Sequence, residues 1–383
     1  KLIRKAKIPK AIMAPIFAEY DNWQAYGQEK TVVAVRSSAL GEDGENSFAG
    51  QYASILNVNR KKIADAYLKV IASKYSPEAL FYRINKGLND EETAMSVLIQ
   101  EMVAAKNSGV LYTSGIDPED GFQDCIHLHV IAGIGERLVG GEETPDYYVL
   151  KKKIPTSVLK KEIHNTGPVD THIQKLTELS IRIEKVFGVA QDIEWAADHD
   201  DKIYILQARS LYRTADHKPQ KKKKLQLNED DVVLDGCTRA SGGIGCGLVY
   251  LVDENNSFED VPSGAVLITR NTPANYVTVI SKLKGVLAEH GSRASHFATV
   301  AREFNIPLLT GIDNVLNQFE KGSIITVDGN TGTVYKGRVN ALLTESPAEF
   351  PKAQERYRRT LEEALKFITP LELIDPAEKN FTP

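Results

Sequence analysis

Residues 288–307 read AEHGSRASHFATVAREFNIP and are the most informative part of the chain. Gly291 suits a turn, and Ser295 is a residue type that caps the first turn of a helix. We therefore expect a short helix from about His296 to Phe304. The free backbone N–H groups and positive dipole of a helix start favour a phosphate. A histidine there can act as a phosphate-accepting nucleophile, although the same pattern also fits a histidine that only packs or caps.

The residues around this stretch predict a compact unit over 235–337. Strand signals at VLIT (266–269) and SIITVDG (323–329) flank a glycine- and serine-rich middle and the short helix. Beyond this unit, residues 338–383 predict one helix from about Pro351 to Phe367 and an extended, proline-punctuated end. This last part is too short to form a core of its own and resembles a linker.

The segment DIEWAADHDDKIYILQAR (192–209) predicts a β-hairpin. A turn at Asp200–Asp201 puts Glu194 opposite Gln207, and the two-residue period of a strand puts Arg209 on the same face. A carboxylate beside an amide carbonyl suits Mg²⁺, and a neighbouring arginine can hold a phosphate. The combination fits a phosphoryl-transfer site, but a ladder of polar cross-strand pairs on a sheet surface gives the same pattern.

A third segment, VRSSALGEDGENSFAGQY (35–52), follows a predicted strand. Arg36 supplies a cation next to two hydroxyls. Three glycines, Gly41, Gly44 and Gly50, let the backbone approach a polyphosphate closely. Read alone, this segment is equally typical of an ordinary polar loop.

The first 210 residues alternate strand-like and helix-like segments, which predicts an α+β or α/β domain. Residues 171–187 predict an amphipathic helix with Asp170 as its cap and Gly188 as its stop. The expected strands are VVAV (32–35), SVLIQEM (96–102), HLHVIAG (127–133), DIEWA (192–196) and IYILQ (203–207). His127 and His129 share one strand face, but without a third ligand a plain sheet face is favoured over a metal site.

The composition is that of an ordinary globular protein: 383 residues, 42% hydrophobic and 26% charged. The length predicts two or three domains. A net charge of −4 gives no global basic field for nucleic acid, and no stretch reaches the length of a membrane span. Three scattered cysteines fit a reducing, cytoplasmic location. The run RTADHKPQKKKK (213–224) predicts a solvated linker, with a phosphate- or nucleic-acid-binding patch as the alternative.

Together these segments resemble the phosphoenolpyruvate synthase/pyruvate phosphate dikinase family. That family joins an ATP-grasp nucleotide domain, a swivelling phosphohistidine domain and a phosphoenolpyruvate/pyruvate barrel. The matching stretches occur in the family's order and are VAVRSSALGEDGENSFAGQY (33–52), LIQEMVAAKNSGVLYTSGIDP (98–118), GIGERLVGGEETPDYYVLKK (133–152), QDIEWAADHDDKIYILQARSL (191–211) and AEHGSRASHFATVAREFNIPLLTG (288–311).

The resemblance implies a role for each matching position. Arg36 corresponds to an arginine that contacts the nucleotide phosphates, and Arg209 to a neighbouring phosphate arginine. Glu194 and Gln207 correspond to the pair that binds ATP and Mg²⁺. His296 corresponds to the histidine that ATP phosphorylates, with release of AMP and phosphate. The phosphoryl group then passes to pyruvate in another domain.

The resemblance also implies an arrangement of domains. We expect an ATP-grasp domain over 1–212 that lacks its N-terminal part, a linker over 213–234, a swivelling β/β/α domain over 235–337 and a C-terminal helical linker over 338–383. The pyruvate-binding barrel has no counterpart here, so we expect a part of a longer polypeptide. A homodimer stays open. Ala294 replaces the threonine that a regulatory kinase modifies in some members, so we do not expect that form of regulation.

Two other function classes remain open from the sequence. A related dikinase or phosphotransferase uses the same two domains on a different acceptor, such as a glucan or an antibiotic. A non-catalytic regulatory module is the second alternative, because the nucleotide site is incomplete.

Overall fold

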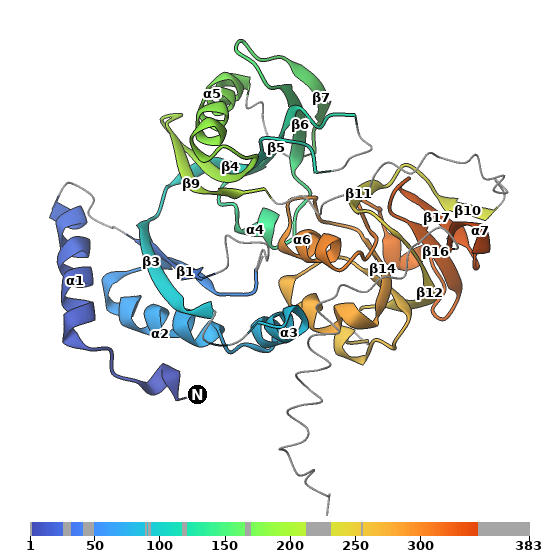
Figure 1. Ribbon diagram of the computed structural model, residues 1–383, viewed down its shortest axis with the longest axis horizontal. Coiled ribbons are helices and arrows are strands. Elements are labelled where there is room, and N and C mark those ends of the chain that lie inside the picture. Colours follow the sequence, from blue (N-terminus) through green and yellow to red (C-terminus); the bar gives the residue numbers. More distant parts are fainter. Residues whose placement is uncertain are drawn as a thin grey trace, which may run out of the picture.

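Three β-sheets with helices packed against them build the described part of the chain in the computed structural model (Figure 1). The structure describes residues 2–25, 32–40, 50–88, 90, 93–116, 121–164, 170–211, 231–253 and 256–343. The lysine run of the expected linker and the helix expected from Pro351 to Phe367 lie outside these residues.

The first sheet is antiparallel and has β1 (Val33–Ala39) between β2 (Ser54–Val58) and β3 (Met95–Glu101). Helices α1 (Lys10–Ala25) and α2 (Ile63–Ser73) pack near it (Figure 1). Apolar residues at three- and four-residue spacing give α2 one apolar face. That face consists of Ile63, Ala66 and Val70, all buried against Val33 and Val35 of the central strand.

Helix α3 (Pro77–Lys86) follows α2 and has clear start and stop signals. The Ser76 hydroxyl accepts a hydrogen bond from the backbone N–H of Ala79, at 3.1 Å, and proline occupies the first helical position. Gly87 ends the helix with φ of 66°. The side chain of Tyr82 is fully buried in a cluster that α3 shares with residues of the eight-stranded unit, so α3 lies where the two parts of the chain meet.

The second sheet is antiparallel, with the order β7-β6-β5-β4-β8-β9. Its strands are β4 (Ala105–Tyr112), β5 (Cys125–Ala132), β6 (Asp146–Lys151), β7 (Val158–Glu162), β8 (Gln191–Asp198) and β9 (Ile203–Ser210). Helix α5 (Asp170–Phe187) covers one face of it (Figure 1). Side chains alternate along β8: Ile193 and Trp195 pack under α5, so Glu194 points to the opposite face. That opposite face is turned toward the third sheet.

The third sheet has eight strands in the order β10-β17-β16-β12-β13-β14-β15-β11. Its strands are β10 (Val232–Leu234), β11 (Thr238–Ser241), β12 (Ile244–Leu251), β13 (Ala265–Thr269), β14 (Leu283–Ala288), β15 (Leu308–Thr310), β16 (Ile324–Asp328) and β17 (Thr333–Lys336). Strands β12 to β15 are parallel to one another. Both faces are covered, which explains the unbroken apolar run of β13. Ala265 and Leu267 join the core with η6 (Ala274–Lys282) and α6 (His296–Glu303), and Val266 and Ile268 pack with η7 (Val315–Asn317).

Shorter helical segments complete the described part of the chain. They are η1 (Ile3–Lys5), η2 (Arg60–Lys62), α4 (Glu136–Val139), η5 (Phe258–Asp260) and α7 (Asn340–Leu343).

The expected secondary structure is largely confirmed. Each strand expected from the sequence is present, and α5 begins at Asp170 and ends before Gly188, whose φ is 73°. Two details differ. Strand β10 lies within residues 213–234, expected as linker, because it pairs with β17. The turn of the β8–β9 hairpin runs from Asp198 to Asp201, one residue earlier than expected.

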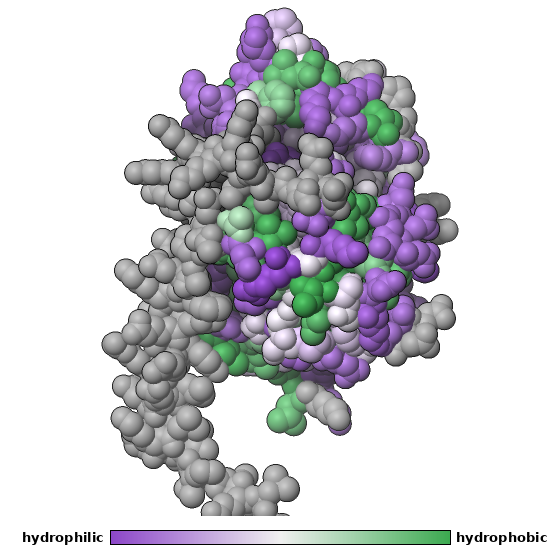
Figure 2. Space-filling view, turned by 90° about the vertical axis from the view of Figure 1, so that its right-hand side faces the viewer, coloured by the Kyte–Doolittle hydropathy of each residue, from purple (hydrophilic) through white to green (hydrophobic). Residues whose placement is uncertain are grey.

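The described surface is that of a folded globular protein. Seen from the right of Figure 1, hydrophobic groups lie among hydrophilic ones (Figure 2). Within the described ranges, every helix is too short or too polar to cross a lipid bilayer.

The core under α5 predicts a stability difference within one sheet. Leu128 of β5 is fully buried, whereas Leu159 of β7 is 47% exposed. Replacing a buried leucine by alanine removes apolar contacts and leaves a cavity. We expect Leu128→Ala to lower the free energy of unfolding by about 2–5 kcal/mol in urea titrations followed by circular dichroism. Leu159→Ala should change it by less than about 1 kcal/mol, and equal effects of the two variants would contradict the assigned core.

Candidate active site around His296

The start of α6 is built as the sequence predicts. The helix runs from His296 to Glu303, and its capping residue Ser295 accepts a hydrogen bond from the backbone N–H of Ala298, at 3.2 Å. The Ser295 hydroxyl also donates to the carbonyl of Ser292, at 3.1 Å, which fixes the preceding turn. His296 is therefore held in the first helical turn, where the backbone offers unpaired N–H groups.

The turn before His296 is anchored to the eight-stranded sheet by two arginines. Arg293 donates from Nε to the carbonyl of Arg239, at 2.7 Å. Arg302 donates from Nη1 to the carbonyls of Ala240 and Arg293, at 2.8 and 2.9 Å. These hydrogen bonds fix the backbone around His296 to its own sheet.

A second part of the site comes from the other two sheets. Arg36 of β1 donates from Nη2 to Glu194 Oε2 at 2.8 Å and to Gln207 Oε1 at 2.9 Å. The expected pairing of Glu194 with Gln207 is confirmed, since the two residues are direct partners on β8 and β9. Residues singled out in two separate segments of the sequence therefore meet at one nitrogen atom of Arg36.

This pairing depends on a β-bulge. Close to the turn, Trp195 pairs with Ile205, so a regular ladder would place Glu194 opposite Leu206. The extra residue on β9, Leu206, shifts the register by one and brings Gln207 opposite Glu194. The earlier turn and the bulge compensate for each other, and the register expected at the site is correct.

Arg209 lies on the same face as Gln207 and pairs with Asp192. Its Nε and Nη2 atoms lie 2.9 and 2.7 Å from Asp192 Oδ2. The negative charge of Asp192 raises the pKa of Arg209. Arg36 of the first sheet and Arg209 of the second therefore both stand beside Glu194.

His296 faces this group of charges. It is partly buried, and burial lowers the pKa of its imidazole to about 4. The negative charge of Glu194 opposes this shift, and the positive charges of Arg209 and Arg36 add to it. Burial alone would raise the pKa of Glu194, but the charge and hydrogen bond of Arg36 outweigh it and hold that pKa below its ordinary value. At neutral pH the site combines a neutral imidazole with an ionised carboxylate.

Gly50 closes the site on the side of the first sheet. Its φ is 65°, and a Cβ atom built on it would lie 2.7 Å from Cβ, Cγ and Cδ2 of His296. Of the three glycines in the 35–52 segment, Gly41 and Gly44 lie outside the described residues. Gly50 is thus required where the backbone touches the imidazole, a contact that the sequence did not predict.

The six-stranded sheet meets the histidine turn through an apolar patch and an aromatic cluster. Ala294 packs on Val110, Tyr112, Ile131 and Leu138. Beside this patch lie the two strand histidines: His127 bonds to the Tyr147 hydroxyl at 2.6 Å, and His129 stacks on the Tyr147 ring. Both histidines are buried, as a plain sheet face implies.

The oxygens of Glu194 and Gln207 fit a divalent cation. Both point at one cationic nitrogen of Arg36, and carboxylate and amide oxygens are the ligands that Mg²⁺ prefers. Two such oxygens hold Mg²⁺ when phosphate oxygens and water complete the shell. No group of three or more histidine, cysteine, aspartate or glutamate side chains among the described residues is arranged as a metal cage.

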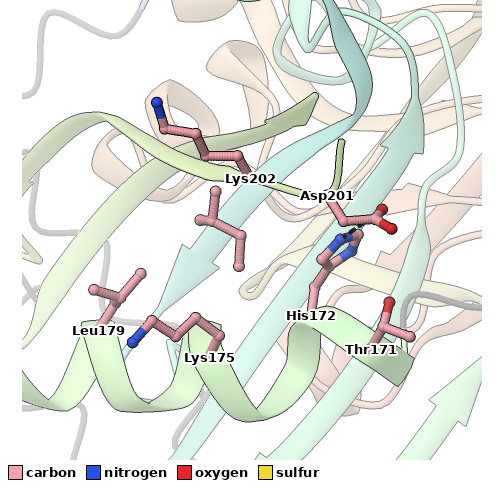
Figure 3. A pocket seen from close by; sticks show the side chains of 7 residues that line it. Thr171, His172, Lys175, Leu179, Asp201 and Lys202 are labelled. Atoms are coloured by element: carbon pink, nitrogen blue, oxygen red, sulfur yellow. Dashed lines mark hydrogen bonds and ion pairs between the residues drawn. The ribbon is translucent and has the colours of Figure 1, made fainter. Parts of the chain in front are cut away.

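A separate hollow of about 410 Å³ lies at the start of α5, and Figure 3 shows its lining. His172 lies 3.1 Å from Asp201 across it, and Lys175 and Lys202 border it. His172 packs near Trp195, on the α5 side of the six-stranded sheet. The sheet therefore separates this hollow from Glu194 and His296.

Comparison with known proteins agrees with this architecture. The family model described as pyruvate phosphate dikinase, AMP/ATP-binding domain, matches residues 1–169 and 165–230. A second, described as PEP-utilising enzyme, mobile domain, matches residues 261–332. The chain belongs to the phosphoenolpyruvate synthase/pyruvate phosphate dikinase family.

Individual members of the family are similar over most of the chain. The phosphoenolpyruvate synthase of Pyrococcus furiosus is 33% identical over 376 residues, covering 89% of this chain and 46% of its own. The probable phosphoenolpyruvate synthase of Staphylothermus marinus is 33% identical, covering 85% and 46%. This family member thus spans about half the length of the curated relatives it matches. A solved structure of Enzyme I matches 29% of the chain with 28% identity and a TM-score of 0.20.

The contact with Gly50 predicts a change in the pKa of His296. A Cβ at position 50 leaves no room for the imidazole, so Gly50→Ala should push the ring into water and raise its pKa from about 4 toward about 6.5. The measurement is an NMR pH titration of the His296 imidazole.

The matched control is Gly188→Ala. Gly188 has a similar φ of 73° but no atom within 4 Å of a Cβ position. This variant has the same backbone strain without the contact, and the pKa of His296 should stay near 4. A pKa near 4 in Gly50→Ala, or a raised one in both variants, would show that the contact does not control the imidazole.

Proposed function

We propose that this protein is an ATP-dependent phosphotransferase of the phosphoenolpyruvate synthase type, in which His296 carries the phosphoryl group. The observation that supports the proposal most strongly is the meeting of His296 with Arg36, Glu194 and Gln207, from three parts of the chain. The names of the relatives favour pyruvate over a glucan or an antibiotic as the acceptor. The assembled site favours an enzyme over a non-catalytic module.

In the proposed first step, a nitrogen of His296 attacks a phosphorus atom of bound ATP. The low pKa of the imidazole supports this role, because the ring is neutral and its lone pair free at neutral pH. Arg36 and Arg209 orient the phosphate oxygens and offset their charge. Attack on the β-phosphorus atom breaks its bond to the bridging oxygen of the α-phosphate, and AMP leaves. Water then hydrolyses the bond between the two phosphoryl groups on His296, so that one leaves as phosphate and one stays on His296.

We propose Glu194 and Gln207 as ligands of Mg²⁺ in this step. The metal, when bound, offsets the negative charge of the phosphates. Glu194 supplies the one charged ligand of the pair, and its lowered pKa keeps it ionised throughout the physiological range. Gln207 adds a neutral oxygen and stays in place through the cross-strand pairing.

In the second step, the unit that carries His296 leaves the nucleotide site and delivers the phosphoryl group to pyruvate, giving phosphoenolpyruvate. The anchoring of the histidine turn to its own sheet supports movement as one body. A pyruvate-binding domain and a homodimer belong to the same proposal. So does a cytoplasmic location, which the small number of scattered cysteines supports.

The proposal predicts that His296 is the site of labelling. Protein incubated with ATP labelled at the transferable phosphate should gain acid-labile radioactivity, and His296→Asn should abolish it. ATP affinity, measured by calorimetry, should be unchanged, because asparagine keeps a polar group of similar size. His290→Asn is the matched control, since His290 lies six residues earlier and its side chain is 47% exposed. Undiminished labelling of His296→Asn would refute the proposal.

The metal assignment predicts a changed Mg²⁺ requirement. Glu194→Gln removes the charged ligand and keeps the shape, so the Mg²⁺ concentration for half-maximal labelling should rise by about tenfold or more. Glu178→Gln, an exposed glutamate on α5 that pairs with Lys175 at 2.9 Å, should leave it unchanged. An unchanged Mg²⁺ requirement in Glu194→Gln would exclude Glu194 as a ligand.

A further inference from the structure

The C-terminal end of α6 contacts α3, which lies in the part of the chain that the AMP/ATP-binding family model matches. Glu303, the last residue of α6, accepts a hydrogen bond from the Tyr82 hydroxyl at 2.5 Å and pairs with Lys86 Nζ at 2.9 Å. Tyr82 and Lys86 lie four residues apart on α3 and so share one face of that helix. The side chains of Glu303 and Lys86 are only 13% and 20% exposed.

Glu303 lies on the same face of α6 as His296. Seven residues are almost two helical turns, so Glu303 lies on the same face as His296, one residue at each end of the helix. His296 touches Gly50, and Glu303 touches α3. The part of the chain that contributes Arg36 therefore holds the same face of α6 at both ends, which fixes both the tilt and the rotation of the helix.

Apolar packing strengthens the contact at the α3 end. The Lys86 ammonium lies 5.5 Å from the centres of both the Tyr82 ring and the Phe304 ring. Tyr82 is fully buried in one core cluster with Phe297 and Val300 of α6. The ion pair is largely shielded from water, so the charges of Lys86 and Glu303 interact more strongly than at an open surface.

We propose that Tyr82, Lys86 and Glu303 form a docking latch that positions His296 for the ATP step. The inference rests on the proposed function, in which α6 leaves the nucleotide site after phosphorylation. Leaving separates α6 from α3, so the latch acts in the ATP step and is open in the acceptor step. Its members are positioning residues, since none of them contacts His296.

Two variants test the latch by removing a charge while keeping most of the side-chain volume. Glu303→Gln removes the charge, and Lys86→Met removes the ammonium and keeps most of the stem. Each should slow the single-turnover labelling of His296 by about tenfold, with ATP affinity changed by less than about twofold. Because the two residues form one pair, the double variant should be about as slow as either single one. Asp65→Asn, which breaks the exposed Asp65–Lys69 pair on α2, is the control.

Hydrogen–deuterium exchange provides a readout that needs no catalysis. In both variants, amides of α3 and α6 should exchange faster than in the parent protein, whereas amides of α5 should not change. Tyr82→Phe, which removes only a hydroxyl, should show the same change in smaller measure. If the parent protein failed to label at all, the proposed function would be wrong, and exchange would still report on the latch.

Other outcomes would overturn the latch. Unchanged exchange and unchanged labelling in Glu303→Gln and Lys86→Met would show that the contact does not position α6. An equal loss of ATP affinity and labelling rate would assign these residues to nucleotide binding instead. Effects that multiply in the double variant would show that Lys86 and Glu303 act independently.

Discussion

The ion pair between Arg36 and Glu194 is the interaction on which the arrangement of the site depends. It joins two sheets through residues 158 positions apart in the sequence, and the same guanidinium nitrogen holds Gln207. Both side chains are partly buried, so either one without the other would leave a costly unpaired charge between the sheets. The pair therefore keeps the two sheets in the relative position from which both can reach His296.

The charges around His296 act differently on the neutral imidazole and on the phosphorylated form that we propose. A neutral imidazole is accommodated among partly buried side chains because it carries no charge. In the proposed cycle, a phosphoryl group on His296 would place negative charge beside Glu194, with Arg36 and Arg209 to offset it. The burial that keeps the imidazole neutral would then disfavour the phosphorylated form at this position. In the proposed cycle this difference contributes to the release of the carrier unit.

Local chemistry explains which parts of the structure could be predicted from the sequence. The cap at Ser295, the stop at Gly188 and the pairing of Glu194 with Gln207 depend on neighbouring residues or on one hairpin, and each is confirmed. The sequence predicts the hairpin turn one residue too late, because nothing in the neighbouring residues reveals the bulge at Leu206.

Contacts between segments far apart in the chain could not be predicted from the sequence. The approach of Gly50 to His296 needs the packing of two sheets, and a glycine pattern that suits phosphate binding also suits close contact with a side chain. The contact of Glu303 with α3 had one available signal, its seven-residue spacing from His296. That spacing identifies a shared helix face but not the partner that covers it.

The strand order of the eight-stranded sheet has a consequence for biosynthesis. Strand β10, among the first of the unit to emerge from the ribosome, pairs with β17, which emerges last, and β11 waits in the same way for β15. The backbone edge of β10 that pairs with β17 is therefore unpaired until Thr333–Lys336 has been translated, and that of β11 until Leu308–Thr310 has been translated. The eight-stranded sheet is therefore completed only after its last strand has been translated, whereas the central β12, β13 and β14 can pair with one another earlier.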